Sequence, residues 1–143
     1  GGNMTKASGV KAIIVKDGKV LVLVENDGRL DLPGGRVEEN EDLSVALDRE
    51  IFEETGLSVK IREIVLCWSF EKSSKLRIDG ATYLCSYVAG KVRLSHEHSK
   101  YFWAKTQELD RLRSAVAGRF RTYLNCTNSI ASSFTENHLA CPR

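Results

Sequence analysis

The chain has 143 residues, a length that suits one domain with a sizeable buried core. Its composition, 42% hydrophobic and 28% charged, is typical of a folded globular protein and excludes a disordered one. A net charge of only +2, with scattered basic residues, gives no reason to expect a nucleic-acid partner, and no apolar stretch is long enough to span a membrane.

The two ends of the chain carry little structural signal. The N-terminus has no signal-peptide pattern, and residues 1–3 resemble an expression scar in front of a native Met4. Residues 125–143 are polar and weakly periodic, so we expect a C-terminal tail or a frayed helix there. We therefore expect one domain over residues 1–143, located in the cytoplasm.

The cysteines are widely spaced and include no Cys-x-x-Cys pair: Cys67, Cys85, Cys126 and Cys141. This spacing favours free thiols in a reducing compartment over a disulfide or zinc framework. Cys67 and Cys85 lie in apolar runs, where cysteine usually behaves as a small buried hydrophobe.

The first third of the chain predicts short strands. Val10–Val15 and Val20–Val24 are β-branched, apolar runs, and Asp17-Gly18 between them is a strong hairpin signal because the turn needs positive φ. A short alternating strand at Leu30–Leu32 follows, and Pro33-Gly34-Gly35 predicts a turn that closes it.

A helix is predicted from about Asp42 to Thr55, because acidic residues precede it and Gly56 stands where a left-handed glycine ends a helix. Thr106 predicts the N-cap of a second helix that runs to about Ala117. The remaining apolar runs read as strands: Val59–Phe70, Ala81–Val88 and Tyr101–Ala104. Mostly strands with two helices predict an α+β fold with a mixed sheet.

Three carboxylates share one face of the first helix, since Glu50, Glu53 and Glu54 stand at i, i+3 and i+4. Like charges at this spacing repel, by roughly 0.2–0.5 kcal/mol per pair, so a positive partner is expected. On a helical wheel the acids continue the apolar stripe of Leu43, Ala46 and Leu47, which a solvated acidic face would not do. Val45 and Phe52 lie on the opposite side and predict apolar contacts on both flanks.

The spacing around these acids is specific. Gly35, five residues, Glu41, seven residues, and then the run from Arg49 to Leu57 resemble the Nudix box, GX5EX7REUXEEXGU, with every fixed position matched. The resemblance extends over about residues 10–110 and implies an α/β/α sandwich with a mixed central sheet.

The resemblance also implies roles for the residues of the box. Glu50, Glu53 and Glu54 are expected to bind Mg²⁺ or Mn²⁺, which prefer hard oxygen ligands, together with the backbone carbonyl of Gly34. Arg49 can reach Glu53 at i+4 and orient it. Three residues are expected to support the loop and helix geometry: Gly35, Glu41 and Gly56.

Outside the box, Glu97 lies just before a predicted strand, where members of the family often carry a glutamate that contributes to the metal site. Both Glu50 and Glu97 are candidates for the general base, and the box does not decide between them. His96 and His98 flank Glu97, but on an extended segment they would point away from it. We therefore expect them at the surface or at the edge of the substrate site and not in a zinc site.

Substrate contacts are less specific in the sequence. Trp68 and Phe70 share a strand face and could stack on a nucleobase, as could Tyr83. The arginines that could clamp phosphate are Arg29, Arg36 and Arg77. Leu30 stands where many relatives have an aromatic residue, Glu39-Asn40 replaces a frequent Pro-Gly, and no subfamily signature follows, so the identity of the substrate stays open.

The resemblance implies Mg²⁺- or Mn²⁺-dependent hydrolysis of a nucleoside diphosphate linked to another moiety. The expected partner is a small nucleotide-type molecule, without membrane or nucleic acid, and the chain could pair as a homodimer as many relatives do. One alternative is a nucleotide sensor on the same fold, although sensors typically lose box glutamates and this chain keeps them all. A diphosphate isomerase would need a reactive cysteine, for which Cys67 and Cys85 have no supporting context.

Overall fold

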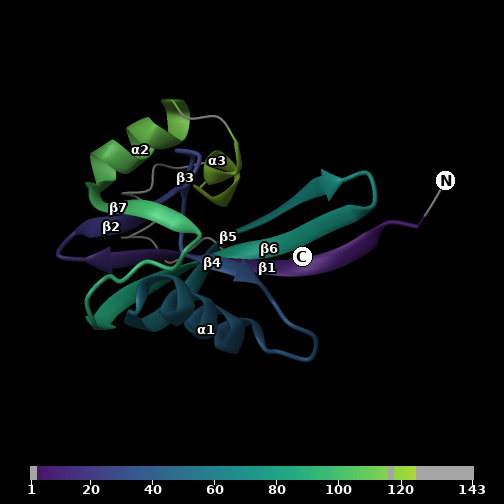
Figure 1. Cartoon of the computed structure of the whole chain (residues 1–143), viewed down its shortest axis with the longest axis horizontal. Helices are drawn as coiled ribbons and strands as arrows, with labels where there is room; N and C mark the ends of the chain where they lie inside the picture. The colour runs from purple at the N-terminus through teal and green to yellow at the C-terminus, as the bar shows by residue number, and fades with distance from the viewer. Residues whose placement is uncertain (1–2, 116–117, 125–143) are drawn as a thin grey trace.

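A central mixed sheet is covered by helices on both faces in the computed structural model, which describes residues 3–115 and 118–124 (Figure 1). The elements in chain order are β1 (Thr5–Lys16), β2 (Lys19–Glu25), β3 (Leu30–Asp31), β4 (Gly34–Arg36), α1 (Leu43–Thr55), β5 (Ser58–Ser73), β6 (Leu76–Ala89), β7 (His98–Lys105), α2 (Thr106–Ala115) and α3 (Arg119–Leu124).

Strand β1 lies at the centre of the sheet. The strands follow the order β3-β2-β1-β6-β5, with β4 paired to β1 and β7 paired to β2. β1 and β6 run parallel, whereas all the other pairs are antiparallel. In Figure 1, α1 covers one face of the sheet, and α2 and α3 lie on the other. The predicted α+β class, an α/β/α sandwich with a mixed central sheet, is confirmed.

Two predicted details are wrong. The run Pro33-Gly34-Gly35 does not simply turn, because Gly34–Arg36 forms the short strand β4 on β1, with Lys11 opposite Gly34. Sequence periodicity also missed α3, whose six residues are too few to show a helical pattern. The predicted end of the second helix at Ala117 and the tail over residues 125–143 lie outside the described residues.

The core has two layers, because alternate residues of β1 point to opposite faces of the sheet. Under α1 the layer contains Val10, Ala12, Ile14, Ala46, Leu47 and Ile51, among others. On the face of α2 and α3 it contains Ile13, Leu109, Phe120 and Leu124, among others. Lys11 belongs to the second face by the same alternation, and it is a buried lysine within the apolar run Val10–Val15.

Helix α1 uses only one of its flanks for packing. Val45 is 54% exposed and Phe52 is 58% exposed, so the expectation of apolar contacts on both flanks is wrong. The elements that α1 contacts most are β4, β1 and β5, all of them strands of the sheet on its one packed side. Its ends are as predicted, with Asp42 at the N-cap and Gly56 in the left-handed region at φ 72°.

The described cysteines differ from each other. Cys85 is a free, buried thiol, and burial raises its pKa to about 12. Cys67 is disulfide-bonded, so the expectation of a free thiol is wrong at this position. Cys126 and Cys141 lie outside the described residues. In the part of the chain that the structure describes, no helix is long and apolar enough to cross a membrane.

Two glycines make room for the ring of Trp68 above β1 and β6. A Cβ atom at Gly80 would overlap the Trp68 ring and would come 2.5 Å from the carbonyl oxygen of Gly9. A Cβ atom at Gly9 would stay 3.2 Å from the same ring. The tryptophan can therefore lie flat on the sheet only because β6 has no side chain at this position.

We predict that Gly80→Ala lowers the free energy of unfolding by about 1–3 kcal/mol, the usual cost of overpacking. Gly9→Ala is the matched control and should cost less, because its Cβ has more room. Urea unfolding of both variants measures the difference. Equal losses, or a larger loss for Gly9→Ala, would show that the Trp68 ring does not impose this constraint.

Candidate active site

The loop before α1 lies against the end of the helix, and its glycines allow that approach. At Gly34, φ is +143°, and a Cβ atom would collide with the backbone of Val10 and Lys11. At Gly35, a Cβ atom would lie 2.5 Å from the carboxyl carbon of Glu50. The Glu50 carboxylate therefore sits directly over the Gly35 backbone, where only glycine leaves space for it.

Glu54 is the buried member of the three box carboxylates. It is 4% exposed, and its Oε1 accepts a hydrogen bond of 2.7 Å from the N–H of Gly34. Burial raises the pKa of Glu54 to about 7, against the lowering effect of Lys11 and of the Gly34 hydrogen bond. The structure thus shows the Gly34 N–H fixing a carboxylate, whereas the expected ligand role of its carbonyl stays a prediction.

Arg49 is held mainly by Glu41. Its Nε and Nη2 donate to the two oxygens of Glu41 over 2.7 and 2.8 Å, and Nη1 donates to Glu50 over 3.0 Å. The expected i+4 contact with Glu53 is the longest of these, at 3.5 Å. The hydrogen bonds from Arg49 and from the backbone N–H of Glu38 lower the pKa of Glu41 to about 2. Glu41 therefore ties the loop to the helix through Arg49.

Glu97 reaches the same site from another element. The loop before β7 is attached to the end of α1, because the N–H of Arg93 donates to the carbonyl of Thr55 and the N–H of Ser95 donates to that of Glu54. Ligand atoms of Glu54, Glu97 and His98 all lie within 4.8 Å of one another. Burial raises the pKa of Glu50, and the charges of Glu53 and Glu97 raise it further. Glu54 and Glu97 therefore lie close together, and Glu50 is near enough to Glu53 and Glu97 for their charges to act on it.

A buried polar chain lies beside these carboxylates. The Nζ of Lys11 donates to Asp31 over 2.8 Å, and the other oxygen of Asp31 lies 3.2 Å from the Nε2 of His98. Burial alone would raise the pKa of Asp31, but the charges of Lys11 and His98 and the hydrogen bonds from both side chains together outweigh it, and the pKa is lowered. Burial alone would likewise lower the pKa of His98, but its hydrogen bond to Asp31 and the charge of Glu54 raise it.

The expectation of a surface position is wrong for His98, whose side chain is only 2% exposed, whereas His96 is exposed. Residues 96–97 form a turn, so the alternation of an extended strand does not apply to them. A register shift between Val24 and Glu25 then pairs Glu25 with His98 on the neighbouring strand. His98 therefore points inward close to Glu97.

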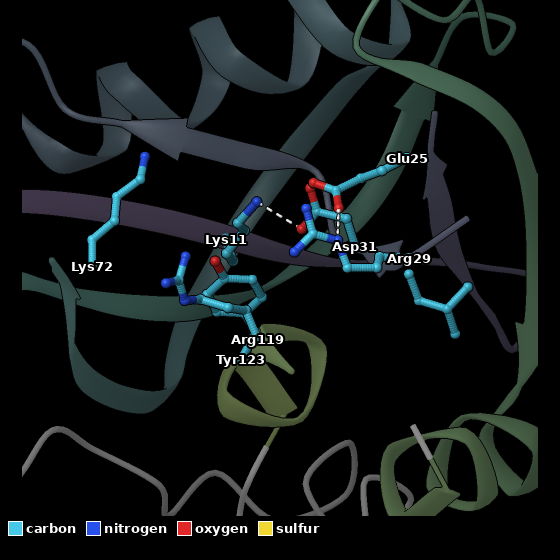
Figure 2. Close-up of a pocket in the computed structure, with 8 residues that line it drawn as sticks. Lys11, Glu25, Arg29, Asp31, Lys72, Arg119 and Tyr123 are labelled. Atoms are coloured by element: carbon cyan, nitrogen blue, oxygen red, sulfur yellow. Dashed lines mark hydrogen bonds and ion pairs between the residues drawn. The ribbon is translucent and has the colours of Figure 1, made fainter. Parts of the chain in front are cut away.

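A hollow of about 310 Å³ opens beside Lys11 and Asp31 (Figure 2), and a second one of about 130 Å³ adjoins it. The two share four lining residues: Lys11, Lys72, Arg119 and Tyr123. Four of the predicted substrate contacts line one or the other: Arg29, Arg36, Trp68 and Phe70. The combined surface is basic and aromatic, which suits an anion that carries a ring.

Two predicted substrate contacts lie elsewhere. Arg77 is on the exposed surface, where its Nε donates to Asp79 and to Ser69 over 2.9 Å each. Tyr83 is buried in the core layer under α1, on the opposite face of the sheet from Trp68. The alternation of β6 alone could not show which of its faces looks into a hollow.

Of the residues that line the larger hollow, only Arg29 was predicted from the sequence, and Lys72, Arg119 and Tyr123 are among those missed. Arg119 lies over the Phe70 ring, 3.9 Å from its centroid, and the Tyr123 ring lies 4.9 Å from that of Trp68. Arg119 and Tyr123 both belong to α3, whose six residues are too few to show a helical pattern in the sequence. Lys11 and Asp31 did leave a signal in the sequence, since each is a charged residue between apolar neighbours.

The donor set of the carboxylate cluster suits a divalent cation. It offers carboxylate oxygens from α1 and from the loop before β7, and burial and mutual repulsion raise the pKa of two of them, Glu50 and Glu54. The Nδ1 of His98 is buried there, and no residue in the described part of the chain forms a hydrogen bond with it. Oxygen-rich clusters of this kind bind Mg²⁺ or Mn²⁺.

Comparison with known proteins identifies the family. The family model described as NUDIX domain matches residues 5–126. The chain belongs to the NUDIX domain family. A MutT-like protein of Streptomyces ambofaciens is 27% identical over 89% of this chain and 82% of its own length. The CTP pyrophosphohydrolase of Escherichia coli (strain K12) is 32% identical over 69% of this chain and 76% of its own length.

A solved structure supports the same assignment. The MutT protein of Methanosarcina mazei Go1 superposes with a TM-score of 0.74 at 25% identity, over 94% of this chain and 97% of that one. By family the chain is a Nudix hydrolase, and the resemblance inferred from the spacing of Gly35 to Leu57 is confirmed.

The contact between Glu41 and Arg49 predicts how the Nudix box responds to acid. The pKa of Glu41 is lowered from 4.5 to about 2, so its stabilising effect is complete above pH 4.5 and is lost as the pH falls through about 2. Glu41→Gln should therefore lower the Tm at neutral pH, with a difference from the wild type that shrinks toward pH 2. Thermal unfolding followed by circular dichroism across this range tests it. A Tm difference that does not depend on pH would contradict the ion pair.

Proposed function

We propose that this Nudix hydrolase cleaves the diphosphate bond of a small nucleotide-type substrate, a nucleoside diphosphate linked to another moiety, and that it depends on Mg²⁺ or Mn²⁺. The observation that carries the proposal is the convergence of Glu50, Glu54 and Glu97 beside Gly35, at the edge of a basic and aromatic hollow. The relationship to a protein named CTP pyrophosphohydrolase supports the reaction class.

The residues of the Nudix box and Glu97 would have different roles in the reaction. A bound divalent cation supplies charge neutralisation for the phosphates and lowers the pKa of coordinated water. Glu50, Glu53, Glu54 and Glu97 would hold it, as the family resemblance implies. Arg49 offsets part of their charge and fixes Glu50 through a hydrogen bond of 3.0 Å. The general base is Glu50 or Glu97, and Glu97 is near enough for its charge to act on Glu50.

The hollows provide an orientation for the substrate. Gly35 and Arg36 line the smaller hollow, and the Glu50 carboxylate lies on Gly35, so phosphate groups would lie at this end. Trp68 and Phe70 line the same hollow and stack with their centroids 5.8 Å apart, which offers a surface for a base. A hollow of about 310 Å³ is at the lower end of the size of small-molecule sites.

Glu53→Gln should reduce kcat by at least about 100-fold, the scale on which charged groups at a reacting centre contribute. The side chain is 57% exposed, so the variant should fold like the wild type, which circular dichroism can verify. Glu39→Gln replaces an exposed acid outside the cluster and is the matched control. Wild-type rates for Glu53→Gln would rule out the assigned role of the box.

Arg36 and Arg77 provide a matched pair for the substrate orientation. Arg36 lines the hollow beside Gly35, whereas Arg77 is bound to Asp79 on the surface. Arg36→Gln should raise KM by about tenfold, because a charge-assisted hydrogen bond contributes about 1.5 kcal/mol or more. Arg77→Gln should leave KM unchanged. An equal effect of both substitutions would contradict the proposed position of the phosphates.

A substrate screen separates the enzyme from a sensor. Nucleoside triphosphates including CTP, dinucleoside polyphosphates, nucleotide sugars and ADP-ribose are incubated with Mg²⁺ or Mn²⁺ and the released nucleotide is measured. We expect hydrolysis of at least one class, abolished by EDTA and restored by either metal. Nucleotide binding without any hydrolysis would favour the sensor. Homodimerisation and a cytoplasmic location stay predictions from the sequence.

A further inference from the structure

The two ring nitrogens of His98 have different surroundings. Nε2 lies 3.2 Å from Oδ2 of Asp31, within reach of a hydrogen bond. Nδ1 is buried in a side chain that is only 2% exposed, and it has no hydrogen-bond partner among residues 3–115 and 118–124. A buried nitrogen without a partner is costly, because it has lost water and gained nothing in return. Some species absent from the protein itself is therefore expected at Nδ1.

The Nδ1 atom faces carboxylates. It lies 3.8 Å from Oε2 of Glu54, which is beyond the 2.7–3.2 Å of a hydrogen bond. Glu97 contributes an oxygen to the same group, whose ligand atoms all lie within 4.8 Å of one another. The space at Nδ1 is thus bounded by three electron-pair donors from α1, from the loop before β7 and from β7.

The neighbours of Nε2 decide which nitrogen carries the proton. Asp31 is an ionised acceptor, because Lys11 Nζ donates to it over 2.8 Å in a buried ion pair. Neutral His98 therefore places its N–H at Nε2, toward Asp31, and its lone pair at Nδ1. A lone pair and a carboxylate oxygen that face each other repel unless a positive species lies between them. That species is either a proton or a metal ion.

The geometry favours a metal ion. A proton joins two acceptors at hydrogen-bond distance, whereas here three donors surround one space at longer separations. Bonds of about 2.1 Å to one ion hold its adjacent ligands about 3 Å apart and its opposite ligands about 4.2 Å apart. In addition, histidines that bind metals usually donate their other N–H to a carboxylate, as His98 does to Asp31.

We propose that His98 Nδ1 is a nitrogen ligand of the divalent cation, beside Glu54 and Glu97, and that Lys11 and Asp31 hold the ring in that orientation. This inference rests on the metal dependence of the proposed function. Imidazole suits transition metals, whereas Mg²⁺ takes hard oxygen donors. The site should therefore prefer Mn²⁺ over Mg²⁺ more strongly than an all-carboxylate site would.

Pulsed electron paramagnetic resonance of the Mn²⁺-loaded protein tests the ligand directly. The electron spin echo of Mn²⁺ should show modulation from a histidine nitrogen, and the modulation should change from ¹⁴N to ¹⁵N when only histidine is labelled with ¹⁵N. Identical spectra with and without the label would overturn the inference while leaving the proposed function in place. If the protein binds no Mn²⁺, the inference fails, and if calorimetry shows no Mg²⁺ binding either, the proposed metal dependence fails as well.

Two variants identify which histidine is responsible. His98→Gln keeps an amide N–H that can donate to Asp31 but removes the imidazole nitrogen. We expect it to lose the histidine modulation, to bind Mn²⁺ about tenfold or more weakly, and to show a lower ratio of Mn²⁺ to Mg²⁺ affinity in calorimetry. His96→Gln changes an exposed histidine two residues away and should behave like the wild type.

Unchanged Mn²⁺ affinity in His98→Gln would overturn the inference, as would a loss of affinity that is equal for Mn²⁺ and Mg²⁺. If His98→Gln does not fold, the isotope experiment on the wild-type protein still decides between a nitrogen ligand and a protonated His98 paired with Glu54. A protonated ring would give no modulation from a histidine nitrogen bound to Mn²⁺.

Discussion

The buried carboxylate of Glu54 is the constraint on which the surrounding structure depends. Burial raises the pKa of this group, which is 4% exposed, to about 7, and its ionised form needs local compensation because desolvation of an unpaired charge is very unfavourable. The N–H of Gly34 provides one hydrogen bond. Lys11 and, when it is protonated, His98 provide positive charge nearby. The need to compensate Glu54 explains why β4 approaches α1 closely at Gly34 and why β1 carries a buried lysine.

The same constraint links the two halves of the site. Lys11 compensates Asp31 and lines both hollows, while Asp31 lines the larger one and contacts His98. The carboxylates of the box and the surface that would receive the substrate are therefore joined by one continuous buried network. Helix α3 is attached to the sheet beside the hollow through Thr82. Its hydroxyl accepts a hydrogen bond from the Trp68 indole and donates one to the carbonyl of Tyr123.

The sequence predicted those parts of the site that are local along the chain. The acids of α1, Gly35 and the left-handed Gly56 belong to one contiguous motif whose spacing is visible in the sequence, and the structure brings Glu50 against Gly35. The buried network was not predictable in this way, because Asp31 lies 20 positions from Lys11 and 67 positions from His98. Only the pairing of β1, β2, β3 and β7 brings these residues together. Tyr83 was misassigned for a related reason, since alternation defines two faces of a strand but does not say which face has a hollow.

The central claim is that the carboxylates beside Gly35 form the divalent-cation site of a Nudix hydrolase. Crystals grown with Mn²⁺, with data collected at a wavelength where manganese scatters anomalously, test it most directly. If these carboxylates bind the cation, an anomalous peak is expected between Glu50, Glu54 and Glu97. A fully occupied peak elsewhere on the protein, or none at this position at saturating Mn²⁺, would contradict it.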